Sequence, residues 1–247
     1  MSDVWEPSRR SSVYEGMARR LTNPGVKAPE FKAILLGEAG VGKTCLFRRF
    51  IGQSFPSGTK TTVASQASDK KVYETDDGDI QVTYWDTAGM ERLASLTETY
   101  YRNTNVAIIL FDVTRRDTFD RVIFWVENIQ ERRHNKDPTK DIKIILVMNK
   151  IDLRTSTGSD TDFVTSSEVM KFIENHQNGS KIQALYEVSA KTMEGVDELQ
   201  SFVVKCLSEE RRTYATMDRD IKSLKLDNDY RSPKFSLKAW VKKSCGF

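Results

Sequence analysis

Short apolar runs alternate along the chain with stretches in which apolar residues recur at helical spacing. The apolar runs, which predict buried strands, cover residues 34–36, 80–85, 106–111, 142–148 and 184–188. Predicted helices cover residues 45–51, 118–133, 167–176 and 196–207, with 91–102 as a further candidate. Because parallel strands need a crossover helix between them, this alternation predicts an α/β domain whose sheet is mostly parallel.

One pair of predicted strands departs from this alternation. Residues 67–75 and 80–85 flank the turn Asp76-Asp77-Gly78-Asp79. An Asp-Gly turn between two strand-like runs is a strong hairpin signal, so it predicts one antiparallel edge strand. In such a sheet, ligands bind at the carboxyl ends of the strands.

A glycine-rich stretch follows the first apolar run. It has the pattern G-x-x-x-x-G-K-T and consists of Gly37, Glu38, Ala39, Gly40, Val41, Gly42, Lys43 and Thr44, followed by Cys45. A strand-to-helix turn of this composition is typical of a P-loop, where backbone amides and a helix N-terminus face phosphate oxygens. Lys43 is expected to reach the terminal phosphates, and the Thr44 hydroxyl to bind Mg2+. The alternative interpretation is an ordinary glycine turn.

A polar segment also follows the run at residues 80–85. It begins with Asp86 and ends with Gly89. A carboxylate at a strand end suits a Mg2+ site, with the Gly89 amide facing the γ-phosphate. Many strands end in Asp, so this signal is weak when taken alone.

Two later strands are each followed by a short polar motif, Asn149-Lys150-x-Asp152 and Ser189-Ala190-Lys191. The carboxylate of Asp152 can accept from the two donors on the Watson-Crick edge of guanine, whereas adenine would leave it unpaired. The amide of Ala190 suits the exocyclic oxygen that guanine has and adenine lacks. Each motif alone favours a polar loop at a strand end. Their occurrence after a P-loop favours a guanine nucleotide site.

Bulk composition narrows the class of function. The 247 residues carry a net charge of +3, which is too small and too evenly spread to predict nucleic acid binding. Three cysteines without a C-x-x-C pair predict neither a disulfide framework nor a zinc site. Without a long apolar run or a signal peptide, we expect a cytoplasmic protein, either free or at the cytoplasmic face of an intracellular membrane.

Three parts are predicted along the chain. Residues 1–30 lack periodicity and predict a disordered extension, residues 31–212 hold the α/β domain, and residues 213–247 predict a flexible tail. Residues 231–247 contain basic and aromatic side chains and no acid. Such a tail either contacts an anionic membrane surface or stays solvated.

The region from 31 to 212 resembles a small GTPase of the Ras superfamily, and its Rab branch in particular. The matching segments are Trp85 before Asp-Thr-Ala-Gly, Glu91-Arg92, Tyr100-Tyr101-Arg102, Leu110-Phe111-Asp112-Val113-Thr114, and Trp125 with Asn128-Ile129. The resemblance implies a P-loop G domain with a six-stranded sheet and five helices, GTP and GDP as ligands, and Mg2+ as cofactor. It also implies a monomeric trafficking switch that binds effectors through two switch segments, an exchange factor and a GTPase-activating protein.

Further site residues follow from the resemblance by position. Phe55 is similar to the aromatic residue that stacks on guanine, with Lys150 on the other side of the base. Thr62 is similar to the switch I threonine that completes the Mg2+ shell, with Thr61 as the alternative register. At Ala67 the family commonly has a phenylalanine that joins Trp85 and Tyr100 in an effector-facing aromatic cluster.

Met90 stands where the family has the glutamine that orients the attacking water. The expected catalytic residues are Met90, Lys43 and Thr62. A thioether donates no hydrogen bond and accepts only weakly, so the hypothesis is slow intrinsic hydrolysis. The alternatives are a tolerated substitution, with the activating protein supplying the missing groups, or a GTP-bound scaffold that recruits effectors. A P-loop kinase is disfavoured by the guanine motif. Cys245 lies in neither a C-a-a-X box nor a double-cysteine ending, so prenylation stays open.

Overall fold

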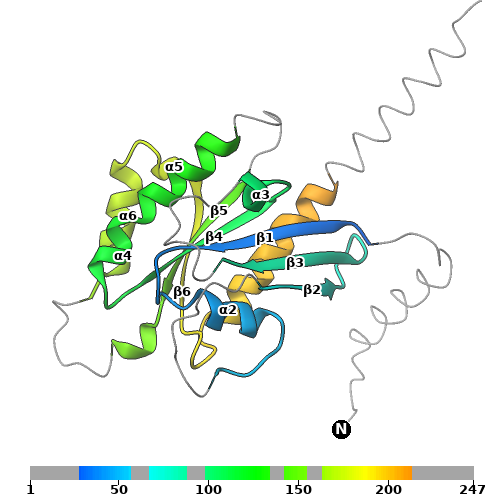
Figure 1. Ribbon diagram of the computed structural model, residues 1–247, viewed down its shortest axis with the longest axis horizontal. Helices are drawn as coiled ribbons and strands as arrows, with labels where there is room; N and C mark the ends of the chain where they lie inside the picture. The colour runs from blue at the N-terminus through cyan, green and yellow to red at the C-terminus, as the bar shows by residue number, and fades with distance from the viewer. Residues whose placement is uncertain (1–27, 57–66, 88–97, 134–141, 155–162, 213–247) are drawn as a thin grey trace, which may run out of the picture. The chain divides into compact units, whose positions relative to one another are not determined.

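The computed structural model describes residues 28–56, 67–87, 98–133, 142–154 and 163–212 (Figure 1). Six strands form one sheet in the order β2-β3-β1-β4-β5-β6. Their bounds are β1 Glu30–Leu36, β2 Ala67–Tyr73, β3 Ile80–Asp86, β4 Val106–Asp112, β5 Lys143–Asn149 and β6 Ile182–Val188. All neighbouring pairs are parallel except β2 with β3, so the predicted mostly parallel sheet with one antiparallel edge strand is confirmed.

Helices connect these strands. Their bounds are α2 Lys43–Phe50, α3 Glu98–Tyr101, α4 Arg116–Asp120, α5 Val122–Arg133 and α6 Ser166–Asn175, with short 3-10 turns η1 Ile151–Leu153 and η3 Gly179–Lys181. Residues 196–208 form the last helix of the first compact unit, which ends at Ser208. Residues 209–212, the described part of a second unit, are also helical.

The single helix predicted over residues 118–133 is wrong, because the structure has two helices there. Arg121 separates α4 from α5 with φ −83° and ψ −5°. Arg121 stays in the right-handed region, but its ψ lies far from the value of about −42° of a regular α-helix, and the helix is interrupted there. Apolar spacing continues across the break and therefore conceals it.

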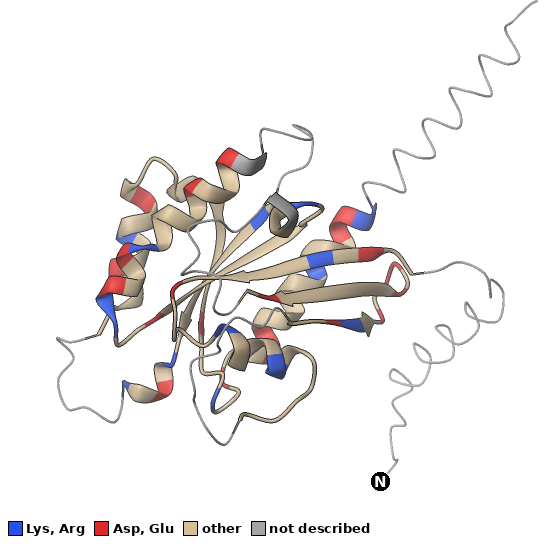
Figure 2. Cartoon of the chain, in the orientation of Figure 1, with Lys and Arg blue, Asp and Glu red and all other residues tan. Residues whose placement is uncertain are grey.

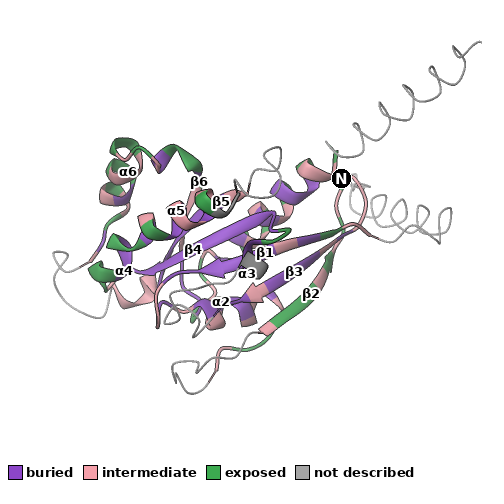
Figure 3. Ribbon diagram, turned by 45° about the horizontal axis from the view of Figure 1, so that its top comes forward, coloured by how far each residue is buried: buried purple, intermediate pink, exposed green. Residues whose placement is uncertain are grey.

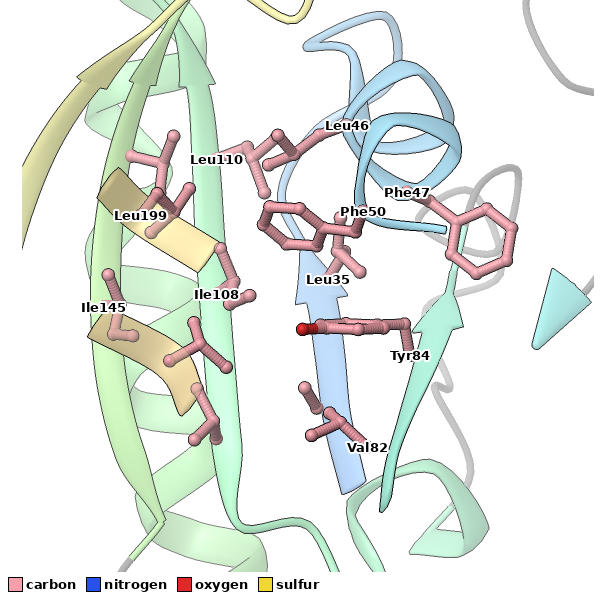
Figure 4. Packing of buried hydrophobic residues seen from close by; sticks show 14 of the residues in the cluster. Leu35, Leu46, Phe47, Phe50, Val82, Tyr84, Ile108, Leu110, Ile145 and Leu199 are labelled. Atoms are coloured by element: carbon pink, nitrogen blue, oxygen red, sulfur yellow. The ribbon is translucent and has the colours of Figure 1, made fainter. Parts of the chain in front are cut away.

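Two apolar clusters lie on opposite faces of the sheet. One joins α2 and the last helix to the sheet, and includes Phe50 and Tyr84, whose ring centroids lie 5.0 Å apart (Figure 4). The other is formed with α5 and α6 and includes Trp125 and Val169. Parallel strands covered on both faces become apolar throughout. β4 is accordingly buried at every position, whereas the edge strand β2 is mostly exposed (Figure 3).

Candidate nucleotide-binding site

The predicted motifs converge on one edge of the sheet. In the strand register, Leu35 of β1 pairs with Asp86 of β3, and Asn149 of β5 pairs with both Asp112 of β4 and Val188 of β6. Each of these residues lies at or next to the carboxyl end of its strand. The loops that follow β1, β3, β5 and β6 therefore begin side by side, as the parallel topology requires.

The glycine-rich loop wraps around the side chain of Lys43. Gly37, Gly40 and Gly42 have φ of 132°, 78° and 100°. Lys43 is the first residue of α2 and is buried, and its ammonium donates to the carbonyl oxygens of Gly37 and Glu38, both at 2.8 Å. The lysine thus stabilises the curvature of the loop from inside, at the N-terminus of the helix.

Arginines from the β4–α4 region support the same loop from outside. Arg115 donates to the carbonyl of Ala39 at 3.1 Å and pairs with Asp117 at 2.5 Å. Its hydrogen bond to Asp117 raises the pKa of Arg115, so the guanidinium stays charged. The Nε of Arg121 lies 3.3 Å from a carboxylate oxygen of Glu38. Neither contact is predictable from the sequence pattern, because each joins segments far apart in the chain.

Asn149 bridges the glycine-rich loop and the loop after β6. Its Nδ2 donates to the carbonyl of Val41 at 2.7 Å, and its Oδ1 accepts from the amide of Ala190 at 3.2 Å. The side chain is buried, and a Cβ placed on Gly42 would lie 2.3 Å from its Nδ2. Asn149 therefore fixes the spacing between the two loops expected to hold opposite ends of a nucleotide.

The carboxylate of Asp152 is oriented by the second polar motif. The Ser189 hydroxyl donates to its Oδ1 at 2.6 Å, and the Lys191 ammonium lies 3.8 Å from its Oδ2. The Ser189 oxygen itself accepts from the amide of Thr192 at 3.1 Å. This chain of bonds fixes the rotamer of a side chain that the sequence assigns to base recognition.

Lys150 is held by a residue that sequence reasoning did not assign to the site. Its backbone has φ 68° and ψ 35°, and its ammonium lies 2.6 Å from Oδ2 of Asp112. The other oxygen of Asp112 accepts from the amide and the hydroxyl of Thr114, at 2.9 and 2.8 Å. Asp112 lies in one of the segments that resemble the Rab branch, and this resemblance was the only sequence signal that could have assigned it to the site.

The residues expected to bind Mg2+ offer suitable oxygen donors. Asp86 is buried at the end of β3, and Thr44 is half-buried in the first turn of α2. Burial raises the pKa of the neighbouring Cys45 thiol. Asp86 pairs with Leu35 of β1, the strand that leads into the glycine-rich loop. One hydroxyl and one carboxylate suit Mg2+, which takes its other ligands from phosphates and water. Among the described residues, no group of three or more His, Cys, Asp or Glu side chains could hold a metal by itself.

Other expected site residues are distributed as follows. Phe55 is half-buried after α2, with the Arg49 guanidinium 5.8 Å from its ring centroid. Thr62, Gly89, Met90 and Cys245 lie outside the described residues. Within the described part of the chain, no helix is both long and apolar enough to cross a membrane.

The aromatic pair expected to face effectors is assembled in the structure. The rings of Trp85 and Tyr100 meet edge to face at 6.4 Å. The Lys32 ammonium lies 4.3 Å from the Trp85 ring and donates to the Tyr100 carbonyl at 2.6 Å. Ala67, opposite Asp86 in the hairpin, contributes no ring.

A protein-family model for the Ras family matches residues 32–209, which is most of this chain. The chain belongs to the Ras family. This Rab-like small GTPase is 36% identical to human Ras-related protein Rab-30 over 171 residues, which cover 68% of this chain and 75% of that protein. It is 32% identical to GTP-binding protein YPT53 of Saccharomyces cerevisiae over 194 residues, which cover 77% of this chain and 83% of that protein.

Another relative is longer than this Rab-like GTPase. Mouse Ras-related protein Rab-26 is 33% identical over 184 residues, which cover 72% of this chain and 63% of that protein. The chain therefore spans less than two thirds of that relative's length. The names of these relatives agree with the Rab branch indicated by the sequence motifs.

Proposed function

We propose that this Rab-like small GTPase is a GTP/GDP-regulated switch that binds its nucleotide with Mg2+ and hydrolyses GTP. The observation that carries the proposal is the bridge made by Asn149 between the Val41 carbonyl and the Ala190 amide. It joins the phosphate loop and the guanine-type motif in one site. Charges of both signs are interspersed over the described elements, in keeping with a ligand held by local contacts (Figure 2).

At the phosphate end, the amides of residues 37–44 surround the phosphate oxygens and Lys43 neutralises their charge. Thr44 and Asp86 hold Mg2+, with Thr62 completing the shell and Gly89 contacting the γ-phosphate. When bound, the ion neutralises the charge that develops on the phosphates. The pairing of Asp86 with Leu35, next to the end of the strand that precedes the glycine-rich loop, supports this assignment.

At the base end, Asp152 accepts from the two donors on guanine and the Ala190 amide donates to its exocyclic oxygen. In the structure that amide donates to Asn149 Oδ1 at 3.2 Å, so the exocyclic oxygen has to share or take over this hydrogen bond when the base binds. Phe55 and Lys150 enclose the two faces of the base. The hydrogen bond from Ser189 to Asp152 supports this role, because it pre-orients the carboxylate.

Nucleotide preference tests the proposal directly. We expect the purified protein to carry a guanine nucleotide, and ATP not to displace GTP at comparable concentration in calorimetry. Binding should depend on Mg2+. Equal affinity for ATP and GTP, or binding of neither, would contradict the assignment.

We further propose that intrinsic hydrolysis is slow, because Met90 cannot orient the attacking water. In a single-turnover assay, Met90→Gln should accelerate hydrolysis by on the order of 10-fold or more, the scale of a transition-state hydrogen bond. Equal rates would show that Met90 is a tolerated substitution. A Lys43→Met variant provides the inactive baseline.

A constitutively GTP-bound scaffold is the second candidate, and Met90 is the observation that favours it. The two candidates differ in turnover. GTP that stays intact on the protein over many hours, even with a GTPase-activating protein, supports the scaffold. GDP accumulation supports the switch.

The proposed setting is vesicle and membrane traffic in the cytoplasm or at a cytoplasmic membrane face. The protein acts as a monomer with effectors at its switch segments, an exchange factor and a GTPase-activating protein. The extension 1–30 and the basic tail 213–247 flank the G domain 31–212, and the tail makes peripheral membrane contact. Intact mass after expression in a eukaryotic cell tests lipidation of Cys245, since an unmodified cysteine rules out that anchor.

A further inference from the structure

Arg49 connects the phosphate-binding helix to the loop after β6. It lies in the last turn of α2, whose first residue is Lys43. Its Nε donates to the carbonyl of Ala190 at 2.8 Å, and its Nη2 donates to the carbonyl of Lys191 at 2.8 Å. The planar guanidinium thus binds two successive carbonyls with two donors, which fixes both distance and direction.

This contact restrains the one loop residue whose amide is assigned to the base. The Ala190 amide donates to Asn149 on one side, and the Ala190 carbonyl accepts from Arg49 on the other. Ala190 is itself buried. Both backbone polar groups of Ala190 are therefore held by side chains, from β5 and from α2, and the direction of its N–H is fixed between them.

The loop's own hydrogen bonds lie elsewhere. The Ser189 amide donates to the Glu194 carbonyl at 2.9 Å, and the Met193 amide donates to the Ser189 carbonyl at 2.9 Å. These bonds close the turn at its two ends. Among the hydrogen bonds observed within the described residues, Arg49 is the only donor to the carbonyls of Ala190 and Lys191. The arginine therefore restrains two peptide groups that the turn's own hydrogen bonds leave unrestrained.

Arg49 also lies near the other part expected to contact the base. Its guanidinium carbon is 5.8 Å from the ring centroid of Phe55, at the limit of a cation–π contact. Arg49 therefore contacts the loop after β6, which is expected to bind the edge of guanine, and approaches Phe55, which is expected to stack on the face of the base.

We propose that Arg49 is a positioning residue for guanine selection, which holds Ala190 so that its amide meets the exocyclic oxygen of the base. The inference rests on the proposed function, because it presumes a guanine nucleotide in the site. Lysine at this position keeps the charge but loses the two-pronged geometry. Selection for the exocyclic oxygen should then weaken while the protein stays folded.

The test compares three nucleoside diphosphates whose bases differ along the recognised edge. GDP has both recognition groups, IDP keeps the exocyclic oxygen but lacks the 2-amino group, and 2-aminopurine riboside diphosphate keeps the amino group but lacks the oxygen and the N1 hydrogen. The wild type should therefore bind the 2-aminopurine nucleotide more weakly than GDP, and the test is the change that each variant causes for each nucleotide. We expect Arg49→Lys to weaken binding of GDP and IDP by about 10-fold, as for a misaligned buried hydrogen bond. Binding of the 2-aminopurine nucleotide should change by less than about two-fold, because it makes no bond to the Ala190 amide.

Arg48→Lys is the matched control, because Arg48 is the neighbouring arginine in the same helical turn and is also half-buried. Within the described residues, no side-chain hydrogen bond of Arg48 is observed, so its substitution should leave all three affinities unchanged. If Arg49→Lys does not fold, Arg49→Gln keeps one amide donor and allows the same comparison.

The outcomes separate the two levels of the argument. Equal losses for all three nucleotides, or no loss for any, would overturn the positioning role while the proposed function stands. A wild-type protein that binds GDP no better than the 2-aminopurine nucleotide contradicts guanine recognition itself, and the inference then fails with it. A loss confined to GDP and IDP supports both.

Discussion

At the base end of the site, side chains hold both the backbone of Ala190 and the side chain expected to contact the ligand, whereas at the phosphate end they hold chiefly the loop backbone. Ser189 donates to Asp152 at 2.6 Å, and that carboxylate is itself the expected ligand contact. By contrast, Lys43 and Arg115 donate to loop carbonyls at 2.8 to 3.1 Å. The phosphate loop therefore depends on backbone shape, and the base loop depends on the chemistry of particular side chains.

The comparison predicts different sensitivities for the two ends. At the base end, a substitution that replaces one functional group should alter nucleotide selectivity. A larger side chain that keeps the same functional group should be tolerated there. At the phosphate end, substitutions should matter chiefly when they alter φ or displace the loop.

At the base end, Asp152→Asn replaces an acceptor by an amide that presents its N–H to the donors of guanine. We expect GDP affinity to fall by roughly 100- to 1,000-fold, on the scale of a mispaired buried polar group. XDP should gain affinity, because its 2-oxo group accepts from the new amide. Calorimetry with both nucleotides measures the reversal, and equal losses for GDP and XDP would contradict a selective role.

At the phosphate end, Gly42→Ala places a Cβ where φ is 100° and where Asn149 Nδ2 lies 2.3 Å away. Strain of this kind and a displaced Asn149 should lower GDP affinity by about 100-fold. Gly52→Ala is the control, because its φ of 81° is also left-handed but no atom lies within 4 Å of the added Cβ. If the two variants bind GDP alike, backbone shape is not what the phosphate loop depends on.

Asp112 lies between the two ends and supports Lys150. Asp112→Asn removes the charge that faces the Lys150 ammonium at 2.6 Å but keeps an oxygen that accepts from Thr114. We expect GDP release to accelerate by about 5-fold in stopped-flow measurements, since a weakened buried pair frees Lys150. Asp120→Asn, an exposed position on α4, should leave the release rate unchanged.

Lys32 lies at neither end and measures the background pH dependence. Burial lowers its pKa from 10.5 to about 8, whereas the unfolded chain keeps the ordinary value. Between these values the unfolded state binds more protons, so the free energy of unfolding rises with pH. Relative to Lys32→Met, the wild type should gain ~1 kcal/mol across this window after solvent screening. The measurement is the urea-unfolding midpoint of each protein as a function of pH. If the two midpoints change with pH in the same way, the lowered pKa is contradicted.

The architecture followed from local pattern, whereas the support of the site did not. The buried run that became β4 and the Asp-Gly turn of the hairpin are signals confined to a few neighbouring residues. Arg49 meets Ala190 across 141 positions, so only the folded chain brings them together. The break at Arg121 was hidden for another reason, because a change in ψ at one exposed residue leaves the apolar period intact.

Motif residues were predictable in kind but not in their mutual contacts. The sequence assigned Asn149 and Asp152 to the base, and that assignment stays a prediction. That Asn149 also holds the carbonyl of Val41 depends on the register between β1, β4 and β5. Thr62, Gly89 and Met90 stay predictions, because the structure does not describe them.

The double contact of Asn149 has a consequence for exchange. The Asn149 side chain is hydrogen-bonded to Val41 at 2.7 Å and to Ala190 at 3.2 Å. A protein that displaces the loop of either residue would therefore strain the other loop through these bonds. On the proposed function, we therefore expect the release of the phosphates and the release of the base to be coupled. An exchange factor that displaces one loop would then weaken nucleotide binding at both ends.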